Sequence, residues 1–295
     1  MTPGRRAEWL LFWMTFIWAG TFVVVKGALA DLSPFLLVAL RFTIATLCLL
    51  PFALPSIRRM NRTVVWKGFL LGFLIYLGFI FQTVGLHYTT ASKSAFITGM
   101  LVIFTPFFQF ILLRRPPRWP NLVGIVIVSA GLWLLTAPAG GAINRGDVLT
   151  LLCALSFSLS IVLIDRFTKE HDPFQLTFLE IASPALFAWL AAPFFERPVF
   201  NPTPYALFTL AYTAILATVV TTYVQTTYQR DTTPTRAALI FTLEPVWTAL
   251  LGFIFLNEVL GVKGLLGGGL IIGGILFSEL AGGPLQEWVS SKKQI

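Results

Sequence analysis

The sequence predicts an all-α membrane protein in which ten transmembrane helices form two inverted five-helix repeats and both termini lie in the cytoplasm. Three observations predict this fold. The 295-residue chain is only 12% charged and has a mean hydropathy of +0.80, whereas a soluble domain carries about a quarter charged residues. Apolar runs of membrane-spanning length recur along the chain, and the second half of the chain repeats the first.

Ten apolar runs are long enough to cross about 30 Å of hydrocarbon at roughly 1.5 Å per residue. The segments between them are short, and several carry prolines or charges, so no soluble domain fits between two spans. We expect transmembrane helices at residues 9–29, 34–54, 68–86, 94–113, 119–137, 147–165, 174–194, 205–226, 235–256 and 264–281.

The distribution of Lys and Arg sets the expected orientation, because the cytoplasmic loops of membrane proteins are enriched in these residues. With the N-terminus inside, cytoplasmic segments hold 15 of the 21 Lys and Arg residues, and outer loops hold four. The other two, Lys26 and Arg41, fall within spans. This asymmetry predicts that both termini are cytoplasmic.

An internal repeat relates the two halves of the chain at two offsets. Residues 18–41 correspond to 157–180 at an offset of 139. At an offset of 143, Gln82, Thr83, Thr89, Thr90, Lys93, Gly124 and Gly131 correspond to Gln225, Thr226, Thr232, Thr233, Arg236, Gly267 and Gly274. The sequence therefore predicts one repeat at 1–139 and a second at 140–295. Since five spans are an odd number, the second copy enters the membrane from the opposite side, which predicts a substrate site near mid-membrane between the halves.

Charged residues inside the predicted spans change sign between the repeats. Lys26 corresponds to Asp165, and Arg41 corresponds to Glu180. A charge within the bilayer is costly unless it meets a partner or water, so the opposite signs favour attraction between Arg41 and Glu180. Snorkelling to the interface and, for Arg41, a contact with a substrate carboxylate are the alternatives. Lys26, Asp165 and Glu258 lie at span ends, where we expect interfacial anchoring.

The chain resembles the EamA-type transporters of the drug/metabolite transporter superfamily. The resemblance rests on the ten-span repeat, on Trp18 and Phe22 in the first span, on Pro34 followed by Arg41, and on the sequence LEPVWTALLGFIFLNEVLG at 243–261. It implies export of amino acids, metabolites or toxic organic compounds across the bacterial inner membrane. The overall pattern is most similar to that of the amino-acid and aromatic amino-acid exporters among these transporters.

Glu244 is the most informative single candidate for the substrate site. It lies near the middle of the ninth span, roughly 15 Å from either face, and directly precedes Pro245. A carboxylate at this depth points to contact with a substrate amine or to proton binding. The structural alternative is a protonated side chain that bonds to the helix backbone opened by Pro245.

Other polar and aromatic residues of the spans are candidates for the same site. Gln82 and Gln225 are equivalent positions, which either donate hydrogen bonds into a cavity or bond to neighbouring helices. The aromatic residues either form a wall for amphipathic substrates or pack against helices and lipid. The full set of predicted substrate-site residues is Trp18, Thr21, Arg41, Tyr76, Phe79, Gln82, Thr98, Phe157, Ser158, Glu180, Tyr223, Gln225, Glu244 and Trp247.

The resemblance, taken with these residues, implies a transporter that exports small organic solutes, with neutral amino acids including hydrophobic and aromatic ones expected first, by alternating access around a central cavity. A multidrug or metabolite exporter and a sugar-phosphate or nucleotide-sugar exchanger are the alternatives, although a phosphate exchanger needs several buried bases. A channel needs a ring of repeated polar groups, and an enzyme needs a clustered nucleophile and base; the sequence contains neither.

The expected partners are a small-molecule substrate and the lipid bilayer. No cofactor, metal site or nucleic-acid partner is expected, because the two His and two Cys residues are isolated and no basic soluble face exists. Proton antiport and downhill export are both compatible with the sequence. Three GxxxG spacings, Gly68/Gly72, Gly264/Gly268 and Gly269/Gly273, predict close packing within a monomer rather than dimerisation, or a weak homodimer at most.

Overall fold

Apolar segments bounded by capping residues fold into helices throughout the part of the chain that this computed structural model describes, residues 2–135, 143–256 and 261–282. Within these residues the only β-type pairing is an isolated bridge between Leu32 and Phe200. Helices satisfy their own backbone hydrogen bonds, which is why they suit a bilayer. Seven of them are long and apolar enough to cross a membrane.

Together with the shorter apolar helices, these seven fit the ten predicted spans, and the predicted all-α fold is confirmed. The helices are α1 (Pro3–Ala28), α2 (Pro34–Ile57), α3 (Arg62–Tyr88), α4 (Ala91–Gly99), α5 (Leu101–Leu113), α6 (Trp119–Leu135), α7 (Arg145–Phe167), α8 (Pro173–Phe195), α9 (Pro204–Ala211), the π-helical segment η1 (Tyr212–Val220), α10 (Thr221–Tyr228), the 3-10 turn η2 (Gln229–Asp231), α11 (Pro234–Phe241), α12 (Leu243–Leu256) and α13 (Val262–Gly282). The predicted boundary between the repeats, 139/140, and the residues Asn257 and Glu258 lie outside the described residues.

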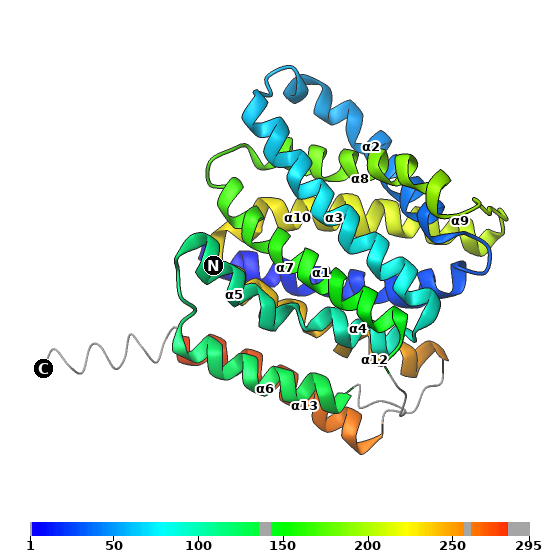
Figure 1. The fold of residues 1–295 in the computed structure, drawn as a ribbon. Helices are drawn as coiled ribbons and strands as arrows, with labels where there is room; N and C mark the ends of the chain where they lie inside the picture. Colours follow the sequence, from blue (N-terminus) through cyan, green and yellow to red (C-terminus); the bar gives the residue numbers. More distant parts are fainter. Residues whose placement is uncertain (1, 136–142, 257–260, 283–295) are drawn as a thin grey trace, which may run out of the picture.

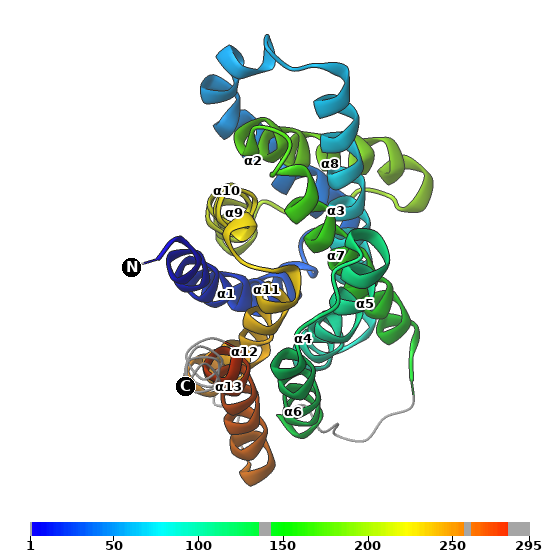
Figure 2. The same ribbon diagram turned by 90° about the vertical axis from the view of Figure 1, so that its left-hand side faces the viewer.

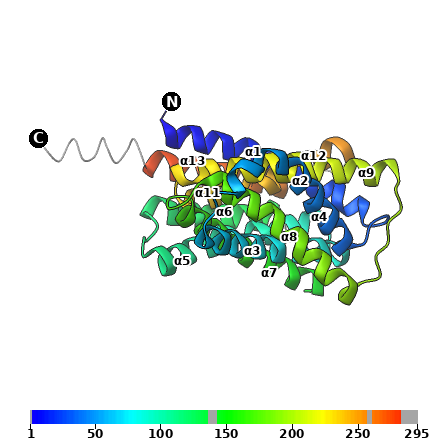
Figure 3. The same cartoon turned by 90° about the horizontal axis from the view of Figure 1, so that it is seen from above.

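The helices run along one common direction, and the chain reverses at each end of the bundle (Figures 1 and 3). Viewed end-on, α2, α3 and α8 gather at one side and α6 and α13 at the other, with α1, α7, α10 and α11 between them (Figure 2). We call the end that carries residues 2–8, 114–118, 168–172 and 231–233 the N-terminal face. The end that carries residues 29–33, 89–90 and 196–203 is the opposite face.

Equivalent residues start equivalent helices in the two repeats. Pro34 and Pro173 open α2 and α8, where a missing backbone N–H costs nothing and the fixed φ suits a helix. The hydroxyl of Thr90 accepts the first-turn N–H of α4 at 3.2 Å, and the hydroxyl of Thr233 does the same for α11 at 3.3 Å. The repeat in the sequence is therefore also a repeat of local structure.

Three spans that hydropathy predicts as continuous are interrupted. The fourth breaks at Met100, between α4 and α5, and the ninth breaks at Thr242, between α11 and α12. At the second break the ring of Pro245 lies four residues after Phe241, and such a ring clashes with the carbonyl four residues earlier. The eighth span contains the π-helical segment η1, a feature that often occurs at functional sites.

Glycines at equivalent positions bring α6 and α13 into close contact. A Cβ on Gly131 would lie 2.7 Å from the carbonyl oxygen of Gly267, and a Cβ on Gly124 would lie 2.9 Å from that of Gly274. The contact is thus symmetric: the first glycine of one helix meets the second glycine of the other. Such close approach of backbones is the usual way in which membrane helices associate.

The predicted close packing at GxxxG spacings holds for one pair and fails for another. Gly68 and Gly72 face α8, where a Cβ would meet Leu179 and Ser183 at 2.5 Å and 1.7 Å. Gly269 and Gly273 have nothing within 4 Å of a Cβ among the described residues. They lie on the side of α13 that faces away from α6, so their spacing reflects no close helix contact within the described part of the chain.

We predict that Gly131→Ala lowers the melting temperature of the detergent-solubilised protein by several degrees, because the new methyl group meets backbone that cannot move away cheaply. Gly269→Ala is the matched control on the partner helix, and there the better helix propensity of Ala should leave the melting temperature equal or slightly higher. Thermal unfolding followed by tryptophan fluorescence measures both. Equal melting temperatures for the two variants would contradict the assigned α6–α13 contact.

Candidate functional site

A cavity of about 50 Å³ lies at the centre of the bundle, between helices of both repeats. We call it the central cavity. Nine of the fourteen predicted site residues line it: Trp18, Thr21, Phe79, Gln82, Thr98, Phe157, Glu180, Gln225 and Glu244. Ile75, Leu101, Ser160, Ile161, Ala217, Thr222 and Phe241 complete the lining.

The two repeat offsets relate most of these lining residues in pairs. At 139 residues apart, Trp18 corresponds to Phe157 and Thr21 to Ser160. The four pairs at 143 residues apart are Phe79 and Thr222, Gln82 and Gln225, Thr98 and Phe241, and Leu101 and Glu244. Both repeats therefore present the same positions to the cavity, as expected where antiparallel copies meet at mid-membrane.

Hydrogen bonds hold several of the lining side chains in place. The indole N–H of Trp18 donates to the Thr221 hydroxyl at 3.1 Å, and its ring meets Phe241 edge-on at 5.2 Å. The Gln225 amide donates to Gln229 at 3.0 Å. The Gln82 amide donates to the Thr98 hydroxyl at 3.4 Å. This distance is long for a hydrogen bond, so the amide can donate instead to a closer acceptor on a bound molecule.

Two carboxylates, Glu180 and Glu244, belong to the cavity lining. Glu180 is fully buried, and one of its oxygens accepts a hydrogen bond from Thr226 at 3.0 Å. Its other oxygen has no hydrogen-bond partner among the described residues. Glu244 is 9% exposed and lies in the first turn of α12. No Lys or Arg occurs among the described residues that line the cavity.

Arg41 is buried immediately behind the cavity wall. Its guanidinium donates to the Thr218 hydroxyl at 2.7 Å and to the Ala217 carbonyl at 2.8 Å, both in η1. The charge also stacks over the ring of Phe79 at 4.1 Å, a cation–π contact that favours a buried guanidinium. Phe79 and Ala217 thus separate Arg41 from the cavity that they line.

The expected attraction between Arg41 and Glu180 is not observed, and no ion pair joins these two described residues. Each bonds instead to a threonine of the same span, Arg41 to Thr218 and Glu180 to Thr226. Eight residues of helix place these threonines about 12 Å apart along its axis. Arg41 and Glu180, whose charges are opposite, therefore each have a separate polar partner on the eighth span.

The four remaining predicted site residues do not line the cavity. Tyr76 packs near Phe187, with ring centroids 5.8 Å apart. Ser158 is fully buried and donates to the Ala154 carbonyl at 2.7 Å. Tyr223 is 40% exposed, and Trp247 donates to the Thr15 hydroxyl at 3.1 Å beside the rings of Phe12 and Phe16.

Span-end charges also have defined places. The Lys26 ammonium donates to the carbonyl oxygens of Leu86 and, at 2.8 Å, of Thr89, at the end of α3, where the helix dipole favours a cation. Asp165 pairs with Lys169 at 2.5 Å at the N-terminal face. Among the described residues, no group of three or more His, Cys, Asp or Glu side chains is placed to hold a metal ion.

Equivalent ion pairs connect the repeats at the two ends of the bundle. At the opposite face, Asp147 pairs with Lys93 at 2.6 Å and accepts from Thr89 at 3.0 Å. We call this contact the opposite-face pair. It ties the start of the fourth span to the start of the sixth.

At the N-terminal face, Glu8 pairs with Arg236 at 3.2 Å and accepts from Thr232 at 3.3 Å. We call this contact the N-face pair. Glu8 corresponds to Asp147 at the offset of 139, and the other two residues correspond to Lys93 and Thr89 at 143. One arrangement of acid, base and hydroxyl thus occurs once at each face.

Known proteins are similar to this chain in sequence and in fold. The chain matches the EamA-like transporter family over residues 5–137 and 144–280. An uncharacterized transporter of Archaeoglobus fulgidus is 34% identical over 266 residues, which cover 90% of this chain and 82% of that protein. An S-adenosylmethionine/S-adenosylhomocysteine transporter of Chlamydia muridarum is 24% identical over 182 residues, or 58% of this chain and 57% of that protein. A crystal structure that is 20% identical in sequence has a TM-score of 0.78 and covers 94% of this chain and 97% of its own.

Proposed function

Because the chain belongs to the EamA-like transporter family, we propose that this multi-pass membrane protein exports small amine-bearing organic solutes. Neutral amino acids with hydrophobic or aromatic side chains are the substrates that we propose first. The observation that carries the proposal is the pair of carboxylates, Glu180 and Glu244, in a cavity lined by aromatic rings and two glutamine amides.

This lining fits an ammonium group attached to an apolar body. A carboxylate in a site shielded from water forms strong charge-assisted hydrogen bonds to an ammonium group. The faces of Trp18 and Phe157 attract a cation and also accept an apolar side chain. The unpartnered oxygen of Glu180 is the acceptor to which we assign the substrate amine.

An exporter of organic cations is the second candidate, because the same carboxylates and rings suit an amine without a carboxylate. Transport of phenethylamine in preference to phenylalanine would favour it. A sugar-phosphate exchanger is disfavoured, since phosphate groups are usually bound by several Lys or Arg residues, and Arg41 lies behind Phe79. The relative that transports S-adenosylmethionine supports a substrate with an amino-acid moiety.

Alternating access is the transport mechanism that we propose. The central cavity, at about 50 Å³, is well below the roughly 300–1,000 Å³ of typical ligand sites, so an amino acid needs a more open state. The N-face pair and the opposite-face pair are both formed here, and we assign to them the closing of the two ends of the bundle. Breaking one pair at a time would open the cavity to one side at a time.

The proposed orientation places the N-terminal face in the cytoplasm of a bacterial cell and the protein in its inner membrane. The excess of Lys and Arg in the loops of that face supports this orientation. Export then means entry of substrate at the N-terminal face and release at the opposite face.

We predict that Glu244→Gln slows transport of labelled phenylalanine into liposomes by about tenfold or more, because an ammonium loses a charge-assisted hydrogen bond worth roughly 1.5–3 kcal/mol. Glu180→Gln should act in the same direction. Glu170→Gln is the matched control, since Glu170 is an exposed loop carboxylate that pairs with Lys67. Wild-type rates for both cavity variants would remove the carboxylates from substrate recognition.

We also predict that the two ion pairs control access from different sides. Ser160→Cys supplies a thiol in the cavity wall, in a protein whose Cys48 and Cys153 are replaced by serine. Lys93→Gln should raise the rate of maleimide labelling from the opposite face about two- to fivefold, and Glu8→Gln should do so from the N-terminal face, as expected for partly exposed pairs.

Right-side-out and inside-out membrane vesicles measure the two labelling rates separately. Glu170→Gln again serves as the control and should change neither rate. If both pair variants raised labelling from the same side, the proposed division between the two ends would be wrong.

A further inference from the structure

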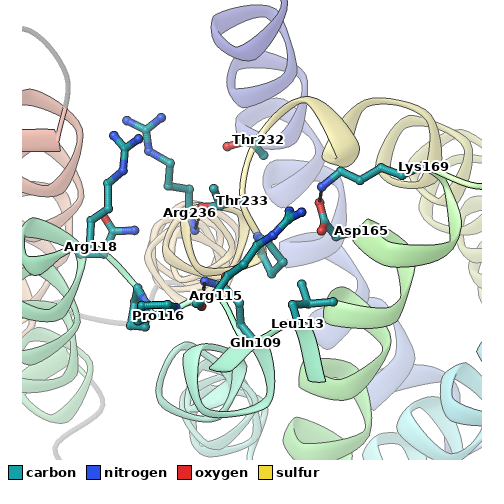
Figure 4. Close-up of a pocket in the computed structure, with 13 residues that line it drawn as sticks. Gln109, Leu113, Arg115, Pro116, Arg118, Asp165, Lys169, Thr232, Thr233 and Arg236 are labelled. Atoms are coloured by element: carbon teal, nitrogen blue, oxygen red, sulfur yellow. Dashed lines mark hydrogen bonds and ion pairs between the residues drawn. The ribbon is translucent and has the colours of Figure 1, made fainter. Parts of the chain in front are cut away.

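A second pocket, of about 180 Å³, lies at the N-terminal face among the ends of α5, α6, α7 and α11. Figure 4 displays the Lys169–Asp165 ion pair on one side of this pocket, Arg118 and Arg236 on the other, and Arg115 between them. Four basic side chains and one acidic side chain line the pocket. We call it the basic vestibule.

The vestibule lies in line with the central cavity, because three of its walls belong to elements that also line the cavity. In α7, Ile161 lines the cavity and Asp165, one helical turn later, lines the vestibule. In α11, Phe241 lines the cavity and Pro234 lines the vestibule. At roughly 1.5 Å per residue, these steps separate the two spaces by about 6–11 Å.

A buried amide holds the loop that carries Arg115 and Arg118. The Gln109 side chain, only 4% exposed, accepts from the backbone N–H of Thr235 at 3.0 Å and from its hydroxyl at 2.9 Å. The same amide donates to the Arg115 carbonyl at 3.0 Å. Gln109 therefore fixes the loop after α5 against the start of α11, and the vestibule has a defined frame.

The charges of the two spaces are complementary to the two ends of an amino acid. The central cavity presents two carboxylates and no base among its described lining, whereas the vestibule presents a net excess of three positive charges. Lys169 is paired with Asp165, and Arg236 with Glu8. The exposed guanidinium of Arg115 makes no side-chain hydrogen bond or ion pair with the described residues, and its planar fork matches a carboxylate.

We propose that the basic vestibule is a second binding site, which takes the carboxylate group of the substrate before the amine reaches the central cavity. Arg115 is the principal contact. This inference rests on the proposed transport of amino acids, and it assigns the two ends of a zwitterion to two places along one route. It also assigns entry to the N-terminal face.

The experiment compares three solutes that share one ring: phenylalanine, 3-phenylpropionate, which lacks the amine, and phenethylamine, which lacks the carboxylate. Binding of 3-phenylpropionate to the purified protein in detergent is measured by titration calorimetry. Arg115→Gln should weaken this binding about three- to fivefold and raise the KM for phenylalanine by a similar factor. The KM for phenethylamine should not change.

Arg114→Gln is the matched control, because Arg114 is the adjacent exposed arginine and does not line the vestibule. It removes the same charge from the same loop and should leave all three solutes unaffected. Arg115→Lys should restore part of the lost affinity. Melting temperatures confirm that the variants fold.

If Arg115→Gln and Arg114→Gln lost equal affinity for 3-phenylpropionate, the binding would depend on the general positive potential of the surface, and the assigned site would be overturned. Failure of 3-phenylpropionate to bind the wild-type protein would overturn it as well. The proposed function is tested separately, by transport of phenylalanine. If the protein bound 3-phenylpropionate through Arg115 but did not transport phenylalanine, amino-acid export would be refuted and the carboxylate-binding site would stand.

Discussion

The odd number of spans in each repeat is the constraint on which the rest of the structure depends. A five-span unit that occurs twice must insert its second copy upside down, so equivalent residues lie at mirrored depths. Near mid-membrane those depths coincide, which is why Gln82 and Gln225 line one cavity. Toward the surfaces the depths diverge, so the Lys93–Asp147 and Glu8–Arg236 pairs occupy opposite faces.

The two copies share their frame and differ in their chemistry. The frame consists of the capping threonines, the prolines that open α2 and α8, and the glycines that join α6 to α13. The differences lie at the cavity, where Leu101 of the first copy corresponds to Glu244 of the second. Arg41, the counterpart of Glu180, is held behind the wall by η1. An asymmetric cavity in a symmetric frame can bind a polar substrate in one orientation.

The sequence predicted the spans well, because hydropathy reports directly on the cost of placing polar groups in lipid. It did not predict the breaks at Met100 and Thr242 or the π-helical segment, because a hydropathy window averages over the few residues that set local hydrogen bonding. For the cavity, residue type alone predicted Ser158, whereas the serine that lines the cavity is Ser160. Two residues turn a helix by about 200°. The repeat offset from Thr21 identifies Ser160, and the offset from Thr98 identifies Phe241.

The inverted arrangement is tested most directly by labelling one pair of equivalent loop residues. Arg58 and Asn201 are 143 residues apart in sequence, and both are exposed. Each is replaced by cysteine in a protein that lacks Cys48 and Cys153, and an impermeant maleimide is added to intact spheroplasts or to inside-out vesicles. We predict that Arg58→Cys reacts only in the inside-out vesicles and Asn201→Cys only in the spheroplasts. Reaction of both cysteines from the same side would contradict it.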